Sequence, residues 1–239
     1  MIVKPILVLA GGFGSRLKSV VSNVPKPLAP VCGKPFLVHL IEHLISQGAK
    51  EFVLLLHYEA ELIQSMIAEV VDRYSLDGVA ITSIVEGVPL GTGGSIANAI
   101  NVLNICESFL VVNADTWLGD GLKQLSLVSP NVIAAVKVKD CSRYGALVLE
   151  GTKIERFLEK KLSNDGGLVN AGLYHLSPNI FTDFLVSDNF SLEADVFPTV
   201  VEKRMLSAIE IDTNFIDIGI PEDYFRFCRW IEAGKKIVL

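Results

Sequence analysis

Three glycines, a serine and an arginine interrupt the first apolar segment of the chain. The stretch from Val8 to Leu17 reads VLAGGFGSRL, so backbone N–H groups without large side chains follow directly after a predicted strand. Such N–H groups bind anions, and the planar guanidinium of Arg16 can donate paired hydrogen bonds to phosphate oxygens. A tight strand-to-helix turn with a surface arginine would also fit this stretch taken alone. With the motifs below, it predicts a phosphate-binding turn.

Two common phosphate-binding motifs do not match this turn. The dinucleotide motif GxGxxG would need a glycine where Leu17 stands. The motif GxxxxGK followed by serine or threonine is also missing from the sequence. A dinucleotide-dependent oxidoreductase is therefore disfavoured.

Lys26 lies between Pro25 and Pro27. Flanking prolines restrict the backbone, so the lysine is expected on a stiff loop. Such a loop suits a point charge that contacts phosphate. A surface lysine in a proline turn is the alternative interpretation of this motif by itself.

Two carboxylates fall where a metal ion could be held. Asp115 follows the apolar segment Phe109–Asn113, and Asp217 lies inside the apolar run Phe215–Ile218. A charge inside an apolar strand is costly unless it is paired or bound to a metal. A buried aspartate that accepts from backbone N–H groups is the alternative. Two carboxylates together with a substrate phosphate are typical ligands of Mg²⁺.

One short pattern imitates a zinc site. His39, Glu42 and His43 match HxxEH, which occurs in zinc proteases. The apolar residues of the same predicted helix are at positions 37, 40, 41, 44 and 45, so we expect the two histidines and the glutamate to face mostly solvent. No third ligand is apparent in the sequence, and we do not assign a metal here.

The elements that must position these residues alternate between strands and helices in the first half. Strands are predicted at residues 2–10, Phe52–Leu56, Val79–Val85 and Phe109–Asn113, and helices from Lys34-Pro35 to Gly48, at Glu59–Arg73 and at Gly93–Leu103. This order predicts an α/β fold with a Rossmann-like, doubly wound, mostly parallel sheet. Gly11–Arg16, Glu86–Thr92 and Asn113–Asp115 would all lie at the carboxyl ends of strands, where such folds bind ligands.

The second half is more mixed, and no linker or repeat separates it from the first. The sequence predicts strands at Val132–Lys139, Ala146–Glu150, Leu168–Leu176, Ser207–Asp212 and Phe215–Ile218, and helices at Pro178–Val186, Leu192–Arg204 and Pro221–Glu232. We therefore expect a single domain over residues 1–239 with an elaborated second half.

Composition narrows the classes of partner. Of 239 residues 50% are apolar, enough for a large core, and the net charge of −6 disfavours binding to nucleic acid or an anionic membrane.

No apolar run approaches the roughly 20 residues that a membrane-spanning helix needs. The N-terminus does not look like a signal peptide, because it runs directly into the glycine turn. The four cysteines form no CxxC pair, which favours reduced thiols and a cytoplasmic location.

The ordered set of motifs resembles the sugar-phosphate nucleotidyltransferase family. The resemblance rests on Leu9–Leu17, Pro25–Pro27, Pro89–Gly94 and Asn113–Asp115, and on Glu159-Lys160 and Asn170–Gly172, which resemble the sugar-recognition segments. Within the family, Arg143–Gly145 and Phe215–Tyr224 are most similar to a guanylyltransferase branch that uses heptose 1-phosphate. Three residues depart from the usual pattern: Ser15 for threonine, Ala114 for glycine and Lys161 for proline.

The resemblance implies a reaction, a metal and a set of contacts. A nucleoside triphosphate and a sugar 1-phosphate would give a nucleotide sugar and pyrophosphate, with Mg²⁺ held by Asp115 and Asp217. Residues 1–115 would form the nucleotide-binding half and residues 116–239 the sugar-phosphate-binding half. Catalysis is assigned by resemblance to Arg16, Lys26 and Asp115. Nucleotide contacts are assigned to Ala10, Gly11, Gly12, Gly14, Ser15, Arg16, Lys26, Glu86, Gly91 and Thr92. Sugar-phosphate contacts are assigned to Asn113, Gly145, Glu159, Lys160 and Asn170.

The choice of substrates is less constrained. A carboxylate at Glu86 can accept from both N1–H and N2–H₂ of guanine, which favours GTP without excluding UTP. The alternatives are a mannose 1-phosphate guanylyltransferase and a uridylyl- or thymidylyltransferase for another sugar. A nucleotide-sugar-binding regulatory module without catalysis is a further alternative, although such a module should have lost Lys26 or a metal carboxylate. We expect a monomer or a homodimer.

Overall fold

The computed structural model describes residues 4–12, 17, 19–21, 24–75, 78–144, 146–158 and 166–234. The chain separates into two compact units that alternate along the sequence. The first contains Met1–Val88, Val112–Gly119 and Asn214–Leu239, and the second contains Pro89–Val111 and Asp120–Thr213. These units divide the chain differently from the predicted halves, so the functional division at residue 115 stays a prediction. Among the described helices, none has the length and apolarity that crossing a bilayer requires.

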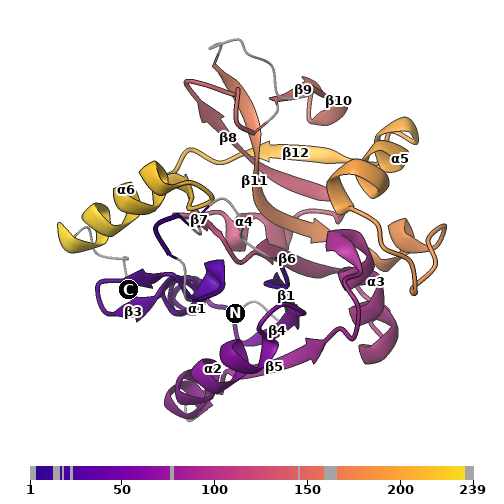
Figure 1. Cartoon of the computed structure of the whole chain (residues 1–239). Coiled ribbons are helices and arrows are strands. Elements are labelled where there is room, and N and C mark those ends of the chain that lie inside the picture. The colour runs from indigo at the N-terminus through magenta and orange to yellow at the C-terminus, as the bar shows by residue number, and fades with distance from the viewer. Residues whose placement is uncertain are drawn as a thin grey trace. The chain divides into compact units, whose positions relative to one another are not determined.

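Parallel strands form the sheet of the first unit (Figure 1). Strands β5 (Ala80–Val85), β4 (Glu51–Leu56) and β1 (Ile6–Leu9) are neighbours in that order, and both pairs are parallel. Ile6, Leu7 and Val8 are fully buried, as expected for a strand covered on both faces. The predicted strand at residues 2–10 is confirmed over Ile6–Leu9.

Strand β6 (Phe109–Asn113) places the segment that contains Asp115 next to this sheet. Its residues Val112 and Asn113 belong to the first unit, and β6 follows β1 in the strand order. The backbone N–H of Ala114 donates to the Leu9 carbonyl at 3.1 Å. Because parallel strands end at the same edge of a sheet, Gly11, His57 and Glu86, which follow β1, β4 and β5, lie along one edge.

Helices and two small ladders complete the first unit. The helices are α1 (Phe36–Ser46), α2 (Ala60–Ser75), which packs beside β5, and α6 (Pro221–Glu232). The ladders pair β2 (Pro30–Val31) with β3 (Lys34–Pro35), and β7 (Thr116–Leu118) with β13 (Phe215–Asp217), both antiparallel. Helix α6 begins at proline and has two acidic residues in its first turn, which suits the positive end of a helix.

The prediction for the histidines of α1 is wrong. His39 and His43 are each only 5% exposed. His39 Nε2 donates to the Val31 carbonyl at 3.0 Å, and the ring of His43 stacks on Trp117 with centroids 4.2 Å apart. The apolar pattern of α1 underestimated its buried face, because the β2–β3 ladder and the β7 strand cover a second side of the helix.

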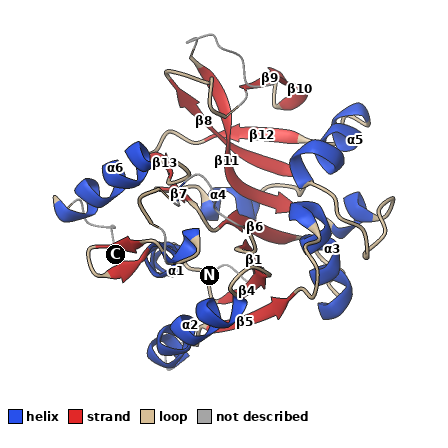
Figure 2. Cartoon of the chain, in the orientation of Figure 1, coloured by secondary structure: helices blue, strands red, loops and turns tan. Residues whose placement is uncertain are grey.

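The second unit contains a mixed sheet (Figure 2). From β6 the strand order continues with β11 (Gly167–Leu176), β8 (Val132–Val138), β12 (Ser207–Glu210), β10 (Lys153–Leu158) and β9 (Ala146–Glu150). β12 runs parallel to β8, whereas β11–β8, β10–β12 and β10–β9 are antiparallel. Its helices are α3 (Gly91–Leu103), α4 (Leu122–Leu127) and α5 (Phe197–Glu202).

In this unit one predicted helix is wrong and one strand was not predicted. The helix predicted at Pro178–Val186 is only a 3₁₀ helix at Pro178–Phe181. The chain turns after Phe181, and Phe184 stacks on Phe190 with ring centroids 4.7 Å apart. The sequence reading also missed β10, which pairs with β9 across a short turn where Gly151 has φ of 62°.

Candidate active site

Lys26 lies on a short, constrained segment of the first unit. Pro25 precedes a 3₁₀ helix over Lys26–Leu28, and the Leu28 N–H donates to the Pro25 carbonyl at 2.8 Å. The lysine side chain is only 8% exposed. The side chain is therefore held in a fixed direction rather than extended into solvent.

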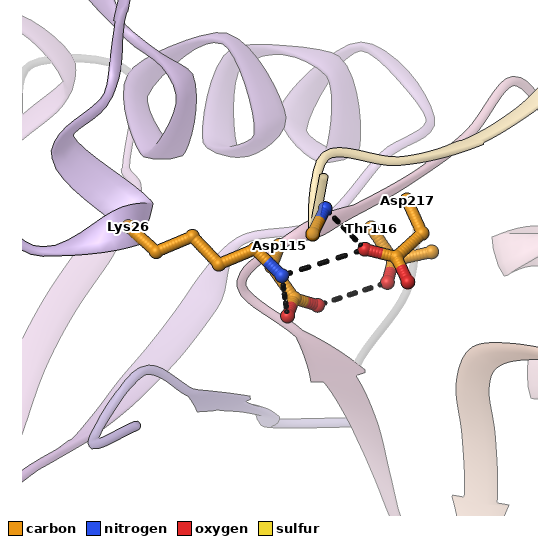
Figure 3. Close-up of polar contacts among 5 residues, drawn as sticks. Lys26, Asp115, Thr116 and Asp217 are labelled. Atoms are coloured by element: carbon orange, nitrogen blue, oxygen red, sulfur yellow. Dashed lines mark hydrogen bonds and ion pairs between the residues drawn. The ribbon is translucent and has the colours of Figure 1, made fainter. Parts of the chain in front are cut away.

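Both predicted metal carboxylates contact this lysine (Figure 3). Lys26 Nζ donates to Asp115 Oδ2 at 2.5 Å and to Asp217 Oδ1 at 3.4 Å. The Thr116 hydroxyl donates to Asp115 Oδ1 at 3.0 Å, and the Gly219 N–H donates to Asp217 Oδ1 at 2.7 Å. Three residues that the sequence analysis selected separately thus meet at one point.

The β7–β13 ladder explains how the two carboxylates meet. Its register places Asp217 opposite Thr116, the residue after Asp115. The Ile218 N–H also donates to the Asp115 carbonyl at 3.0 Å. The register therefore places the backbone of Asp217 one position away from that of Asp115, and the contacts of Lys26 with both carboxylates bring the two side chains to the same site.

The pair is electrostatically suited to a cation. Burial raises the pKa of Asp217 and the like charge of Asp115 raises it further, whereas Lys26 and the Gly219 N–H act in the opposite direction. Two carboxylates supply hard oxygen ligands, as Mg²⁺ prefers. Among the described residues, no group of three or more His, Cys, Asp or Glu side chains is placed to hold a metal. Substrate phosphate and water are the usual further ligands of Mg²⁺ held by two carboxylates.

The described part of the glycine turn is closely packed up to Gly11 and open at Gly12. Ala10 is buried, and its N–H donates to the Leu55 carbonyl at 3.1 Å. A Cβ on Gly11 would lie 3.2 Å from the backbone nitrogen of His57, whereas a Cβ on Gly12 would meet nothing within 4 Å. Gly14, Ser15 and Arg16 lie outside the described residues, and their predicted phosphate contacts stay predictions.

Glu86 and His57 lie at the carboxyl ends of neighbouring strands. Glu86 is 8% exposed, and its N–H donates to the Leu56 carbonyl at 2.8 Å. His57 Nδ1 donates to the Glu86 carbonyl at 3.0 Å. His57 thus lies between Gly11, which packs against its backbone, and Glu86, to which its side chain donates. Sequence reasoning missed this residue. Its position directly after the apolar run 52–56 was the available signal.

Asn113 ends β6 in the same unit. Its Oδ1 is buried and has no hydrogen-bond partner in the described part of the chain. A buried amide oxygen without a partner is costly, which is consistent with a ligand contact at this position. Its predicted role toward the sugar phosphate stays a prediction.

The remaining predicted contacts that the structure describes belong to the second unit. Gly91 begins α3 with φ of 73°, and Thr92 follows it. Asn170 lies on β11, where its Nδ2 donates to the Tyr174 hydroxyl at 2.9 Å. Gly145, Glu159 and Lys160 lie outside the described residues.

Fold and site together define a class. An α/β fold in which a lysine contacts two carboxylates, one of them just after β6, fits enzymes that transfer phosphate-linked groups. The nucleotidyl transferase family matches residues 5–233, and the chain belongs to this family.

Individual relatives agree with this membership. The D-glycero-alpha-D-manno-heptose 1-phosphate guanylyltransferase of Campylobacter jejuni is 35% identical over 222 residues, which are 92% of this chain and 97% of the relative. A mannose-1-phosphate guanyltransferase of Eremothecium gossypii is 34% identical over 227 residues, which are 91% of this chain but 62% of the relative. The crystal structure of HddC from Yersinia pseudotuberculosis complexed with GMP-PN has a TM-score of 0.80 at 35% identity and covers 95% of this chain and 99% of its own. These matches confirm the predicted Rossmann-like α/β fold, which is the fold of the nucleotide-diphospho-sugar transferases.

Proposed function

We propose that this chain transfers a guanylyl group from GTP to D-glycero-α-D-manno-heptose 1-phosphate and releases pyrophosphate. The observation that carries the proposal is the convergence of Lys26, Asp115 and Asp217, at 2.5 and 3.4 Å, in a member of the nucleotidyl transferase family. The product, GDP-heptose, would serve cell-surface polysaccharide synthesis from the cytoplasm.

The chemistry of this reaction fits the residues that are present. The attacking sugar phosphate is already ionised near neutral pH, so no general base is required. The difficulty is to bring two anions together and to stabilise charge that develops at the α-phosphate and on pyrophosphate. Lys26 supplies one positive charge on a constrained segment, and Arg16 is proposed to supply another. Mg²⁺, when bound by Asp115 and Asp217, supplies further positive charge next to the phosphates.

The choice of GTP rests on Glu86. Its carboxylate follows β5 and is largely shielded from water. With a base that lacks matching donors, the carboxylate oxygens would lose hydrogen bonds that water could not replace. Guanine offers N1–H and N2–H₂ to one carboxylate, whereas uracil and adenine do not offer that pair. The heptose enzyme and the mannose enzyme among the relatives are both named as guanylyl- or guanyltransferases.

The choice of heptose over mannose rests on the resemblance of Arg143–Gly145 and Phe215–Tyr224 to the heptose branch of the family. The heptose relative is 35% identical to this chain over 222 residues. Mannose 1-phosphate is the second candidate sugar. The uridylyl- and thymidylyltransferases and the non-catalytic module stay as alternatives that the experiment must separate. The oligomeric state, monomer or homodimer, stays a prediction.

A substrate screen tests the proposal. Pyrophosphate release is measured with GTP, ATP, UTP and dTTP, each combined with heptose, mannose and glucose 1-phosphates in the presence of Mg²⁺. The highest kcat/KM is expected for GTP with the heptose. A higher value for mannose would reassign the sugar, and a higher value for UTP would reassign the nucleotide. Release with no pair would favour the binding module.

A further inference from the structure

A carboxylate to which no motif drew attention joins two predicted substrate residues within the second unit. Glu193 Oε2 accepts from the Thr92 hydroxyl at 2.9 Å and from the Ser191 hydroxyl at 3.2 Å. Glu193 Oε1 accepts from the Tyr174 hydroxyl at 3.4 Å. Three hydroxyl groups therefore converge on one carboxylate, which can accept about four hydrogen bonds.

This arrangement fixes Thr92. Its single hydroxyl hydrogen is directed to Glu193, and its oxygen accepts from the Leu192 N–H at 2.8 Å. Thr92 lies in the first turn of α3, directly after Gly91, in the segment assigned to the nucleotide by resemblance. Glu193 therefore holds the beginning of the nucleotide-side helix.

The same carboxylate orients Asn170 through Tyr174. Because the Tyr174 hydroxyl directs its hydrogen to Glu193, its oxygen accepts from Asn170 Nδ2 at 2.9 Å. The Gly172 N–H donates to Asn170 Oδ1 at 2.9 Å, so the two ends of the amide have distinct partners. An amide has two hydrogens and two lone pairs, and this geometry keeps one further donor and one further acceptor for a ligand. Tyr174 is fully buried beside Phe197, which makes it a rigid link.

The backbone before Glu193 is docked on the Gly91 segment. The Phe190 N–H donates to the Leu90 carbonyl at 3.0 Å, and the Gly93 N–H donates to the Phe190 carbonyl at 2.9 Å. A Cβ on Gly91 would lie 2.5 Å from the Phe190 carbonyl oxygen, a distance that real Cβ atoms do not show. Glycine is therefore needed at position 91 for this close approach as well as for its positive φ.

Glu193 itself lies in a π-helical turn, Leu192–Val196, which precedes α5. The Ser191 hydroxyl caps this turn by accepting from the Ala194 N–H at 3.1 Å. π-helical turns cost stability and occur frequently at functional sites. The turn gives Glu193 its direction toward Thr92 and Tyr174.

We propose that Glu193 is a positioning residue that sets Thr92, on the nucleotide side, and Asn170, on the sugar side, in one geometry. The inference rests on the proposed function and adds to it a shared group through which the two substrate contacts are coupled. Glu193 touches neither substrate in this role.

Steady-state kinetics of the full chain test the inference, with GTP and the sugar 1-phosphate of highest turnover. Thr92→Val should raise the KM for GTP about fivefold or more and leave the KM for the sugar phosphate unchanged, because the hydrogen bonds to Glu193 and from Leu192 are lost on the nucleotide side only. Tyr174→Phe should raise the KM for the sugar phosphate and leave the KM for GTP unchanged. Glu193→Ala should raise both KM values, and adding Tyr174→Phe to it should raise the KM for the sugar phosphate less than Tyr174→Phe does alone, because the link from Tyr174 to Glu193 is already broken. Glu193→Gln, which keeps one acceptor oxygen, should fall between wild type and Glu193→Ala.

Asp195→Asn is the matched control. Asp195 lies in the same turn, and its carboxylate accepts from the Ser191 N–H at 2.7 Å rather than from the three hydroxyls. Both KM values should stay within about twofold of wild type, the scatter expected of a surface substitution. An equal effect of Asp195→Asn and Glu193→Ala would overturn the inference, because the fold of the turn would then be the cause.

The two proposals fail in different ways. Wild-type turnover together with unchanged KM values in Glu193→Ala would overturn only the role of Glu193. No pyrophosphate release by the wild type would overturn the proposed function. In that case the affinity for a non-hydrolysable GTP analogue would be measured for the wild type and for each variant. Thr92→Val and Glu193→Ala should both weaken that binding, whereas Tyr174→Phe should leave it unchanged. Unchanged binding in Glu193→Ala would overturn the positioning role independently of catalysis.

Discussion

The Lys26 ammonium donates to the Asp115 carboxylate at 2.5 Å, although 89 residues separate the two along the chain. The same ammonium lies 3.4 Å from Asp217 Oδ1. One positive charge is thus shared between two carboxylates. This relationship makes specific predictions about turnover and about metal binding.

Lys26→Ala should reduce turnover by about a hundredfold or more, the usual effect of removing one group that stabilises charge in a transition state. Asp115→Ala should have an effect of similar size. The measurement is the rate of pyrophosphate release, with the melting temperature checked for each variant. Lys34→Ala is the matched control, because Lys34 also forms an ion pair at 2.5 Å in this unit, with Glu42, but is 36% exposed and lies outside the site. Near wild-type turnover in both site variants would contradict the assignment.

Metal binding without nucleotide should change in the opposite direction to turnover. Lys26 contacts the same carboxylates that are proposed to hold Mg²⁺, so lysine and metal compete. We expect Lys26→Ala to bind Mn²⁺ about tenfold more tightly than wild type, because the two negative charges are then uncompensated. Asp217→Ala should bind it more weakly than wild type. Electron paramagnetic resonance of free Mn²⁺ measures both. Unchanged affinity in Lys26→Ala would mean that lysine and metal use separate positions.

Glu86→Gln should reduce the preference for GTP. Glutamine offers one acceptor and one donor, so it cannot accept from both guanine donors. We expect the ratio of kcat/KM for GTP to that for UTP to fall about tenfold, which corresponds to the loss of about one buried hydrogen bond. Unchanged turnover with UTP serves as the internal control for folding. A ratio equal to that of wild type would remove the argument for base recognition by Glu86.

Mild acid should destabilise the fold through His39. Burial lowers the pKa of His39 below 6.5, and the hydrogen bond to the Val31 carbonyl only partly opposes this. Between the lowered pKa and 6.5 the unfolded chain holds more protons than the folded one, so the free energy of unfolding decreases as pH falls through this range. His39→Gln, which keeps a donor for Val31, should show a smaller decrease between about pH 7.5 and pH 5.5 in urea denaturation. The same slope in both proteins would show that His39 does not carry this dependence.

The sequence predicted the framework of the first unit because its signals are local. The apolar run before Gly11, the helical pattern of α3 and the proline that opens α6 each specify an element by themselves. It misjudged His39 and His43, because the second covered side of α1 arises from strands β2, β3 and β7. The helix predicted at residues 178–186 failed for a similar reason: Phe190 docks against the Gly91 segment, and no local pattern predicts that contact.

For the site, the sequence determined which groups are available: a glycine turn, a lysine between prolines, and carboxylates at two strand ends. Residue type and immediate neighbours are enough for that, because they set backbone stiffness and charge. Only the tertiary structure decided which groups meet. The β7–β13 pairing brings the end of β13 next to Asp115, and Lys26 contacts Asp217 although the two lie 191 positions apart along the chain. The docking of Phe190 brings Glu193 to Thr92. Hydrogen-bond register and close packing act between distant segments, and neither is encoded in any short stretch of the chain.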